Sequence, residues 1–211
     1  MSIEKFYNSW SASYDADRNL TRDLAGTVLR ELLADKRFNT IVETGCGTGG
    51  NTIFLASLCS SLIALDFSEG MLSVAQAKAS TDELASRITF VQSDLTTPWP
   101  VQSGSADCVV CTLVLEHIDE LVPVFREAWR VLNRGGAFLV SELHPERQLL
   151  GGKATFQSEG RQIEIPAFNH SEQQFTEAAC SAGFSEFTIR SHRHPADGDK
   201  SPRIFSMFCT K

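Results

Sequence analysis

The stretch Thr40-Ile-Val-Glu-Thr-Gly-Cys-Gly-Thr-Gly-Gly-Asn51 runs from a short apolar segment directly into a turn that contains four glycines. The β-branched pair Ile41 and Val42 favours a β-strand. The glycines at positions 45, 47, 49 and 50 allow backbone conformations, and a close approach of a ligand, that a Cβ atom would block. The stretch therefore predicts a strand that ends at a ligand-binding turn.

From residue 40 onward, strand-like and helix-like segments alternate with short connections, which is the pattern of a parallel sheet with crossover helices. The expected strands are Thr40–Glu43, Leu62–Asp66, Ile88–Gln92, Cys108–Leu113 and Ala137–Val140, followed by Glu186–Arg190 and Arg203–Cys209. The last two flank a loop with two prolines and are expected to be antiparallel. The predicted fold class is α/β, a Rossmann-like doubly wound sheet that is mostly parallel, with an antiparallel C-terminal hairpin strand.

The length of 211 residues suits one α/β domain with a buried core and is too short for a second domain of comparable size. We expect a single domain with three parts, namely a helical N-terminal cap (1–37), a ligand-binding core (38–142) and a substrate-side insertion (145–170). A last helix is expected to start at Ser171, because Gln174 completes the spacing of a capping box.

The net charge of −7 and the pI near 5.2 argue against tight sequence-independent binding to nucleic acid or to an anionic membrane. The N-terminus lacks the pattern of a signal peptide, and no apolar run approaches the roughly 20 residues that span a bilayer. These features predict a cytoplasmic protein, with a monomer and a homodimer both open.

The chain contains six cysteines, which are expected to be free thiols. Cys108 and Cys111 have the spacing of half a zinc site, but residues three apart in a strand face opposite sides of the sheet. With no second such pair, no metal site is predicted.

The segment Gly45–Gly50 also satisfies the dinucleotide fingerprint G-x-G-x-x-G, and Asp66 follows at about the distance of a ribose-binding acid. However, Glu43 stands two residues before the first glycine, where its carboxylate would repel a pyrophosphate. The same carboxylate suits a cofactor that has an amino group and no phosphate.

Acidic residues follow four of the predicted strands, at Glu43, Asp66, Asp94 and Glu116. The carboxyl ends of parallel strands meet at one edge of the sheet, where ligands bind. Each acid alone could simply cap the next helix. Their joint placement with the glycine turn suits S-adenosylmethionine, which carries an ammonium group, a ribose diol, an adenine amino group and a sulfonium.

At these positions the chain resembles the class I S-adenosylmethionine-dependent methyltransferases of the small methyltransferase-11 type. The resemblance lies in Glu43–Gly49, Leu65–Leu72, Ser93–Leu95, Leu113–Ile118 and Val131–Leu139. The segment Phe6–Asp15 is similar to the family's tyrosine–aspartate entry motif. One departure is mild, since the first acid is Glu where Asp is commoner.

The resemblance implies S-adenosylmethionine as cofactor and a set of residues that bind it. The implied residues are Tyr14, Glu43, Gly45, Cys46, Gly47, Thr48, Asp66, Phe67, Met71, Asp94, Leu95 and Leu113. Glu43 and the first glycines would lie at the methionine end, with the backbone of Leu113. Asp66 would take the ribose hydroxyls, and Asp94 the adenine amino group. Phe67, Met71 and Leu95 would support adenine, and Tyr14 would close over the cofactor.

Methyl transfer from a sulfonium is an in-line displacement, and a base is needed only for acceptors that must lose a proton. The candidate bases are His144 and His117, with His170 as a third. We expect His144 to act, because it follows a strand end and precedes a proline, although it could also be a structural loop residue. His144→Ala is then predicted to lower turnover and spare cofactor affinity. His117 is expected to have a structural or cofactor-side role.

The acceptor pocket is expected to be built by the N-terminal segment and the insertion, with Trp10, Arg147, Phe156, Arg161 and Phe168. The predicted function is methyl transfer to an oxygen or nitrogen of a small metabolite, with release of S-adenosylhomocysteine. Two alternatives remain open, namely methylation of a transfer RNA base and a non-catalytic, cofactor-binding regulator. A nicotinamide dehydrogenase is a remote third.

Overall fold

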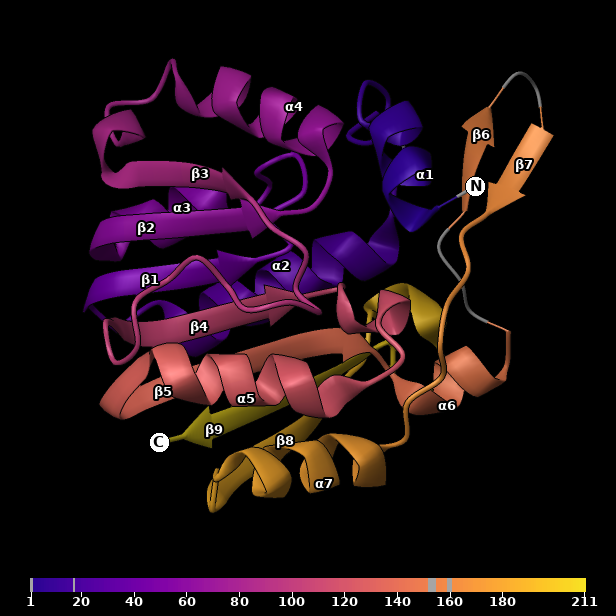
Figure 1. Ribbon diagram of the computed structural model, residues 1–211. Coiled ribbons are helices and arrows are strands. Elements are labelled where there is room, and N and C mark those ends of the chain that lie inside the picture. The colour runs from indigo at the N-terminus through magenta and orange to yellow at the C-terminus, as the bar shows by residue number, and fades with distance from the viewer. Residues whose placement is uncertain (1, 17, 152–154, 159–160) are drawn as a thin grey trace.

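The computed structural model of the chain describes residues 2–16, 18–151, 155–158 and 161–211. Its centre is a seven-stranded sheet in the order β3-β2-β1-β4-β5-β9-β8 (Figure 1). The strands are β1 (Phe38–Thr44), β2 (Cys59–Asp66), β3 (Ile88–Gln92), β4 (Ala106–Thr112), β5 (Leu132–Leu143), β8 (Glu186–His192) and β9 (Ile204–Thr210). The first five are parallel, and β9 pairs antiparallel with both β5 and β8. The predicted fold class is confirmed.

Helices cover both faces of this sheet (Figure 1). They are α2 (Leu20–Leu33), α3 (Thr52–Ser57), α4 (Glu69–Ala79), α5 (Leu121–Val131) and α7 (Glu172–Ala182). Alternate residues of the strands face two separate cores. Val42 and Val109 pack with α5 and α7, whereas Ile41, Cys108 and Val110 pack with α2 and α3. This alternation is the physical basis of the doubly wound architecture.

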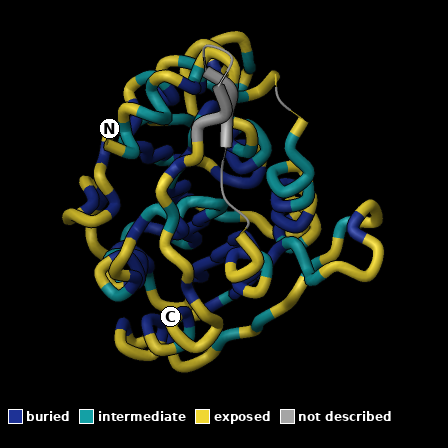
Figure 2. The backbone as a smooth tube through the Cα atoms, turned by 90° about the vertical axis from the view of Figure 1, so that its right-hand side faces the viewer, coloured by how far each residue is buried: buried dark blue, intermediate teal, exposed yellow. Residues whose placement is uncertain are grey.

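Shorter elements gather at the edge of the sheet where the parallel strands end (Figure 1). They are α1 (Ile3–Trp10), the 3₁₀ helix η2 (Leu115–His117), α6 (Pro145–Leu149) and a hairpin of β6 (Thr155–Ser158) and β7 (Arg161–Glu164). Two further 3₁₀ turns are η1 (Ala85–Arg87) and η3 (Pro195–Asp197). Figure 2 looks at this edge and shows exposed segments in the outer loops around a buried centre.

Local signals in the sequence explain several boundaries. Ser171 caps α7 and forms the predicted capping box with Gln174, while Gly183 ends the helix in a left-handed conformation. Cys108 and Cys111 lie in different cores, so they do face opposite sides of the sheet. Within the described residues, no group of acids, histidines and cysteines is arranged to hold a metal, and no helix could cross a membrane.

Candidate functional site: a cavity at the strand ends

A cavity of about 610 Å³ opens at the carboxyl ends of β1, β2 and β4. All twelve residues expected to bind the cofactor line it, and so does His117. The N-terminal segment contributes Ile3, Tyr7, Tyr14 and Asp15, and α2 contributes Arg22, Asp23, Gly26 and Arg30. The tertiary structure thus brings the predicted cofactor residues together around one space.

The glycine turn after β1 forms one wall of the cavity. Gly45 has φ +67°, and a Cβ built on it would lie 2.2 Å from Cγ2 of Val114. Gly47 has φ +55°, and a Cβ there would meet no atom within 4 Å. Gly45 is therefore required by both conformation and space, whereas conformation alone favours glycine at position 47.

Asp66 connects the glycine turn to the end of β2. Its Oδ2 accepts a 2.8 Å hydrogen bond from the amide of Gly47, and its Oδ1 accepts one of 2.9 Å from the amide of Ser68. The residue is only 6% exposed, and this burial raises the pKa of its carboxyl above the ordinary value. The two amide bonds counteract that rise and fix the carboxyl at the cavity wall.

Glu43 is the second buried acid of the cavity and is 4% exposed. Its Oε2 accepts a 2.7 Å hydrogen bond from the hydroxyl of Thr52. Burial raises the pKa of Glu43 to about 8, and the nearby charge of Asp66 adds to the rise. A cationic ligand would relieve this penalty, because an opposite charge favours the ionised carboxylate.

The N-terminal segment is tied over the cavity by side-chain hydrogen bonds. Oδ1 of Asn8 accepts from the hydroxyl of Ser68 at 2.7 Å and from the amide of Gly70 at 2.9 Å. Farther along, the hydroxyl of Thr48 donates to Asp15 Oδ1 at 2.8 Å. These contacts hold α1 against the start of α4, beside the glycine turn.

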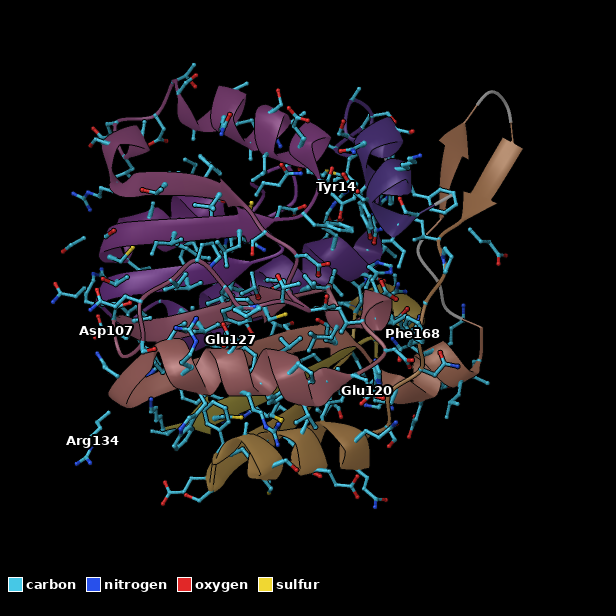
Figure 3. All side chains as sticks on the ribbon, in the orientation of Figure 1. Tyr14, Asp107, Glu120, Glu127, Arg134 and Phe168 are labelled. Carbon is cyan, nitrogen blue, oxygen red and sulfur yellow. The ribbon has the colours of Figure 1, made fainter. Side chains whose placement is uncertain are left out.

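Aromatic rings of this segment line the same space. The ring of Tyr14 lies 4.6 Å from the ring of Trp10, centroid to centroid. The guanidinium of Arg22 stacks on the Tyr14 ring, 4.7 Å from the centroid of that ring. Arg22 also donates a 2.6 Å hydrogen bond to the carbonyl of Tyr14. Figure 3 shows Tyr14 between α1 and the carboxyl ends of the strands. Arg22, on α2, therefore fixes Tyr14 in the lining of the cavity.

The turn after β4 is held by a buried acid that sequence reasoning missed. Leu113 has φ +56°, a left-handed conformation that is unusual for leucine. Oε1 of Glu142, on β5, accepts from the amides of Val114 at 2.9 Å and Leu115 at 3.1 Å. Glu142 thus fixes the turn that carries the cavity residue Leu113. In the sequence, only the location of Glu142 in a long apolar strand pointed to this role.

Sequence reasoning also missed a direct contact of His117. The Tyr7 hydroxyl lies 2.7 Å from Nε2 of His117, and Nδ1 of the same ring lies 3.1 Å from the carbonyl oxygen of Pro166. Both side chains line the cavity. Tyr7 lies inside the aromatic-rich segment Phe6–Asp15 that resembles the tyrosine–aspartate motif, seven positions before Tyr14, and that segment was the only sequence signal for it.

His144 lies outside the lining of the cavity, contrary to the expectation that it faces the ligand. It is 3% exposed, and its Nδ1 accepts a hydrogen bond from the amide of Glu146, which caps α6. Its Nε2 lies 3.0 Å from the hydroxyl of Ser191 on β8. His170 is also buried and bonds the carbonyl of Ile118 at 2.8 Å. Both rings have structural partners here.

The residues expected to form the acceptor pocket are dispersed. Trp10 is buried beside Ile165, Arg147 lies 3.2 Å from Asp197, and Phe168 is 38% exposed. The side chains of Phe156 and Arg161 lie outside the described residues. None of the described residues from 145 to 170 lines the cavity. The insertion instead contacts η2, where the amide of Phe168 donates a hydrogen bond to the carbonyl of Glu116.

Comparison with known proteins agrees with this arrangement. The model of a family described as a methyltransferase domain matches residues 42–140. An uncharacterized methyltransferase of Emericella nidulans is 29% identical over 84% of this chain and 74% of its own length. A demethylmenaquinone methyltransferase of Lactococcus lactis is 30% identical over 68% of this chain. The family model and these relatives support a class I S-adenosylmethionine-dependent methyltransferase.

Solved structures support the fold of this methyltransferase. An S-adenosylmethionine-dependent methyltransferase from Mesorhizobium loti superimposes with a TM-score of 0.72 at 20% identity, over 88% of this chain and 96% of that one. A DhpI complex with S-adenosylhomocysteine gives a TM-score of 0.69 over 98% and 94% of the two chains. The cofactor of the present chain is S-adenosylmethionine. The chain spans only 59% of the Lactococcus enzyme, so its acceptor is a separate question.

Proposed function

We propose that this methyltransferase transfers the methyl group of S-adenosylmethionine to an oxygen or nitrogen of a small molecule and releases S-adenosylhomocysteine. One observation carries this function. A single cavity is lined by the glycine turn and the strand-end acids Glu43, Asp66 and Asp94, and also by Tyr7, His117 and the apolar residues Ile3 and Ile118. Cofactor and acceptor would therefore share one enclosed space, as an in-line displacement requires.

The charges of the cavity suit one orientation of the cofactor. Glu43 would face the ammonium group, and Asp66 would take the ribose hydroxyls. Asp94 and Leu95 would flank adenine, with Phe67 and Met71 beside it. The lining cations among the described residues, Arg22 and Arg30, both come from α2. The methionine carboxylate would therefore face this helix.

The acceptors named for relatives differ in chemistry. Demethylmenaquinone methyltransferases and malonyl-[acyl-carrier protein] O-methyltransferases both match this chain. The net charge of −7 does not favour docking of transfer RNA. Small acceptors that enter the cavity unaccompanied fit this surface better.

The test is a screen of candidate acceptors for release of S-adenosylhomocysteine, together with calorimetric titration of the cofactor. We expect S-adenosylmethionine to bind and to be consumed with phenols, hydroquinones or amines. Cofactor binding without turnover on any acceptor would instead indicate a regulatory cofactor-binding protein. A salt-sensitive mobility shift with bulk transfer RNA would favour the nucleic-acid alternative.

A further inference from the structure

Tyr7 and His117 come from segments 110 residues apart and form a hydrogen-bonded pair inside the cavity. The Tyr7 ring also lies 6.0 Å from that of Phe67, centroid to centroid. Phe67 follows Asp66 directly, on the cofactor side of the cavity. The phenol is therefore placed between the proposed cofactor site and the imidazole.

The partner of the other ring nitrogen determines where the proton of His117 resides. A carbonyl oxygen can only accept a hydrogen bond, so Nδ1, which faces Pro166, must carry the hydrogen. Burial lowers the pKa of His117, so the ring is neutral near pH 7 and its Nε2 is a bare acceptor. It follows that the Tyr7 hydroxyl donates to Nε2.

Two hydrogen bonds hold this arrangement in place. The amide of Phe168 donates a 2.7 Å hydrogen bond to the carbonyl of Glu116, and Nε2 of His170 lies 2.8 Å from the carbonyl of Ile118. Pro166 lies just before these two contacts. The segment therefore runs alongside η2, and the carbonyl that selects the tautomer is fixed.

A buried carboxyl lies next to the same ring. Oε1 of Glu116 is 3.7 Å from Nε2 of His117, and burial raises the pKa of Glu116 to about 7. Among the described residues, its Oε2 has no hydrogen-bond partner. An imidazolium formed at His117 would pair with the ionised form of this carboxyl, which favours uptake of a proton by the ring.

We infer that Tyr7 is a catalytic residue that contacts the acceptor and passes the acceptor's proton to His117, so that the acceptor is a protic group such as a phenol, a hydroquinone or an ammonium. This assignment rests on the proposed function and deepens it. Burial raises the pKa of Tyr7 well above its ordinary value, with Tyr14 and Glu116 adding to the rise. A free phenolate is therefore disfavoured, and the phenol acts as a relay.

The step balances in atoms and charge. The acceptor oxygen or nitrogen forms a bond to the methyl carbon while the carbon–sulfur bond breaks. The electron pair of the broken carbon–sulfur bond stays on sulfur, so the sulfonium becomes the neutral thioether. The acceptor's proton moves to the Tyr7 oxygen as the Tyr7 proton moves to Nε2 of His117. The phenol is regenerated, and the imidazolium later loses its proton to solvent. A carboxylate acceptor has no proton to lose and would not need this pair.

The tautomer can be tested without knowing the acceptor. Histidine labelled with ¹⁵N and two-bond proton–nitrogen spectra at pH 7.5 distinguish the two neutral forms, and His117→Gln identifies the signal among the five histidines. We expect His117 as the Nδ1–H form, with Nε2 shifted by Tyr7→Phe. His192→Asn is the control, because that ring contacts Ser206 on β9, outside the lining of the cavity. An Nε2–H form would overturn the inference.

The relay itself is tested by measuring turnover with two classes of acceptor, hydroquinones and carboxylic acids. Tyr7→Phe and His117→Gln should each lower kcat on hydroquinones by roughly 10²- to 10⁴-fold, the usual contribution of acid–base catalysis. Affinity for S-adenosylmethionine should stay unchanged, and the double variant should be no worse than either single variant. Multiplied losses in the double variant, unaltered turnover of Tyr7→Phe, or methylation of carboxylic acids alone would each contradict the relay. Failure of the wild-type protein to bind the cofactor would instead count against the proposed function.

Discussion

The amide of Gly47 donates a 2.8 Å hydrogen bond to Oδ2 of Asp66, and this bond joins the turn after β1 to the end of β2. The same carboxylate would receive the ribose hydroxyls of the cofactor. Asp66 therefore has a structural and a ligand-binding task, which can be separated experimentally.

Asp66→Asn should weaken S-adenosylmethionine binding by roughly 10- to 100-fold, because hydrogen bonds to a charged group contribute about that much affinity. The matched control is Asp107→Asn. Asp107 accepts from the amides of Asn39 and Thr40 at 2.7 and 2.8 Å, but lies at the opposite edge of the sheet (Figure 3). Calorimetry should show a weaker cofactor affinity only for the first variant. Equal affinities in the two variants would contradict the role of Asp66.

Cofactor binding should release a proton from Glu43. Its pKa is about 8 in the folded protein against 4.5 ordinarily, so between these values the unfolded chain binds fewer protons than the folded one. The contribution of Glu43 to stability therefore falls as pH rises from about 4.5 to 8. The cofactor ammonium favours the ionised form, so affinity should rise over this window.

Titration calorimetry in two buffers of different ionisation enthalpy measures that proton. Glu43→Gln should abolish the pH dependence of the affinity. Glu142 also has a pKa raised to about 8 by burial, so it should still contribute to the pH dependence of the free protein's stability in that variant. Proton release that persists in Glu43→Gln would assign the linkage to another group.

Arg22 should recognise the methionine carboxylate. Arg22→Met should weaken binding of S-adenosylmethionine by roughly 10-fold or more, because a charge-assisted hydrogen bond is lost. It should leave affinity for decarboxylated S-adenosylmethionine almost unchanged, since that ligand has no carboxylate. Arg30→Met is the companion variant from the same helix. If Arg22→Met lowers the affinity for both ligands equally, the arginine acts through Tyr14, on whose ring it stacks.

Glu142→Leu should destabilise the fold by about 2–5 kcal/mol, because the part-buried amide of Val114 and the buried amide of Leu115 lose their acceptor. Glu142→Gln should lower the free energy of unfolding much less, because the amide oxygen of Gln can still accept the two hydrogen bonds. Urea unfolding measures both free energies. The left-handed turn at Leu113 should also relax in Glu142→Leu, with a weaker cofactor affinity. An equal loss in both variants would mean that charge, rather than the acceptor oxygen, holds the turn.

Several elements could be predicted because their signals are local. The capping box at Ser171 and the β-branched start of β1 depend on neighbours a few residues away. The predicted strands were confirmed, although β5 extends farther in both directions, from Leu132 to Leu143. Its extra length comes from pairing with β4 and β9, which no local pattern encodes.

The candidate bases illustrate the opposite case. His144 and His117 both follow strands of the sheet, and strand position alone cannot tell where a ring points. The amide of Glu146 and the hydroxyl of Ser191 engage His144, while His117 meets Tyr7 in the cavity. Those partners are selected by packing between distant segments.

The sequence by itself determined the sheet, the glycine turn and the cofactor class, because the carboxyl ends of parallel strands must share one edge and carry Glu43, Asp66 and Asp94 to it. Only the tertiary structure decided the acceptor side. The contact of Tyr7 with His117 joins residues 110 positions apart, and the carbonyl of Pro166 sets the tautomer. Such contacts depend on how α1 and the segment after β7 dock on η2, and no periodicity or motif records that docking.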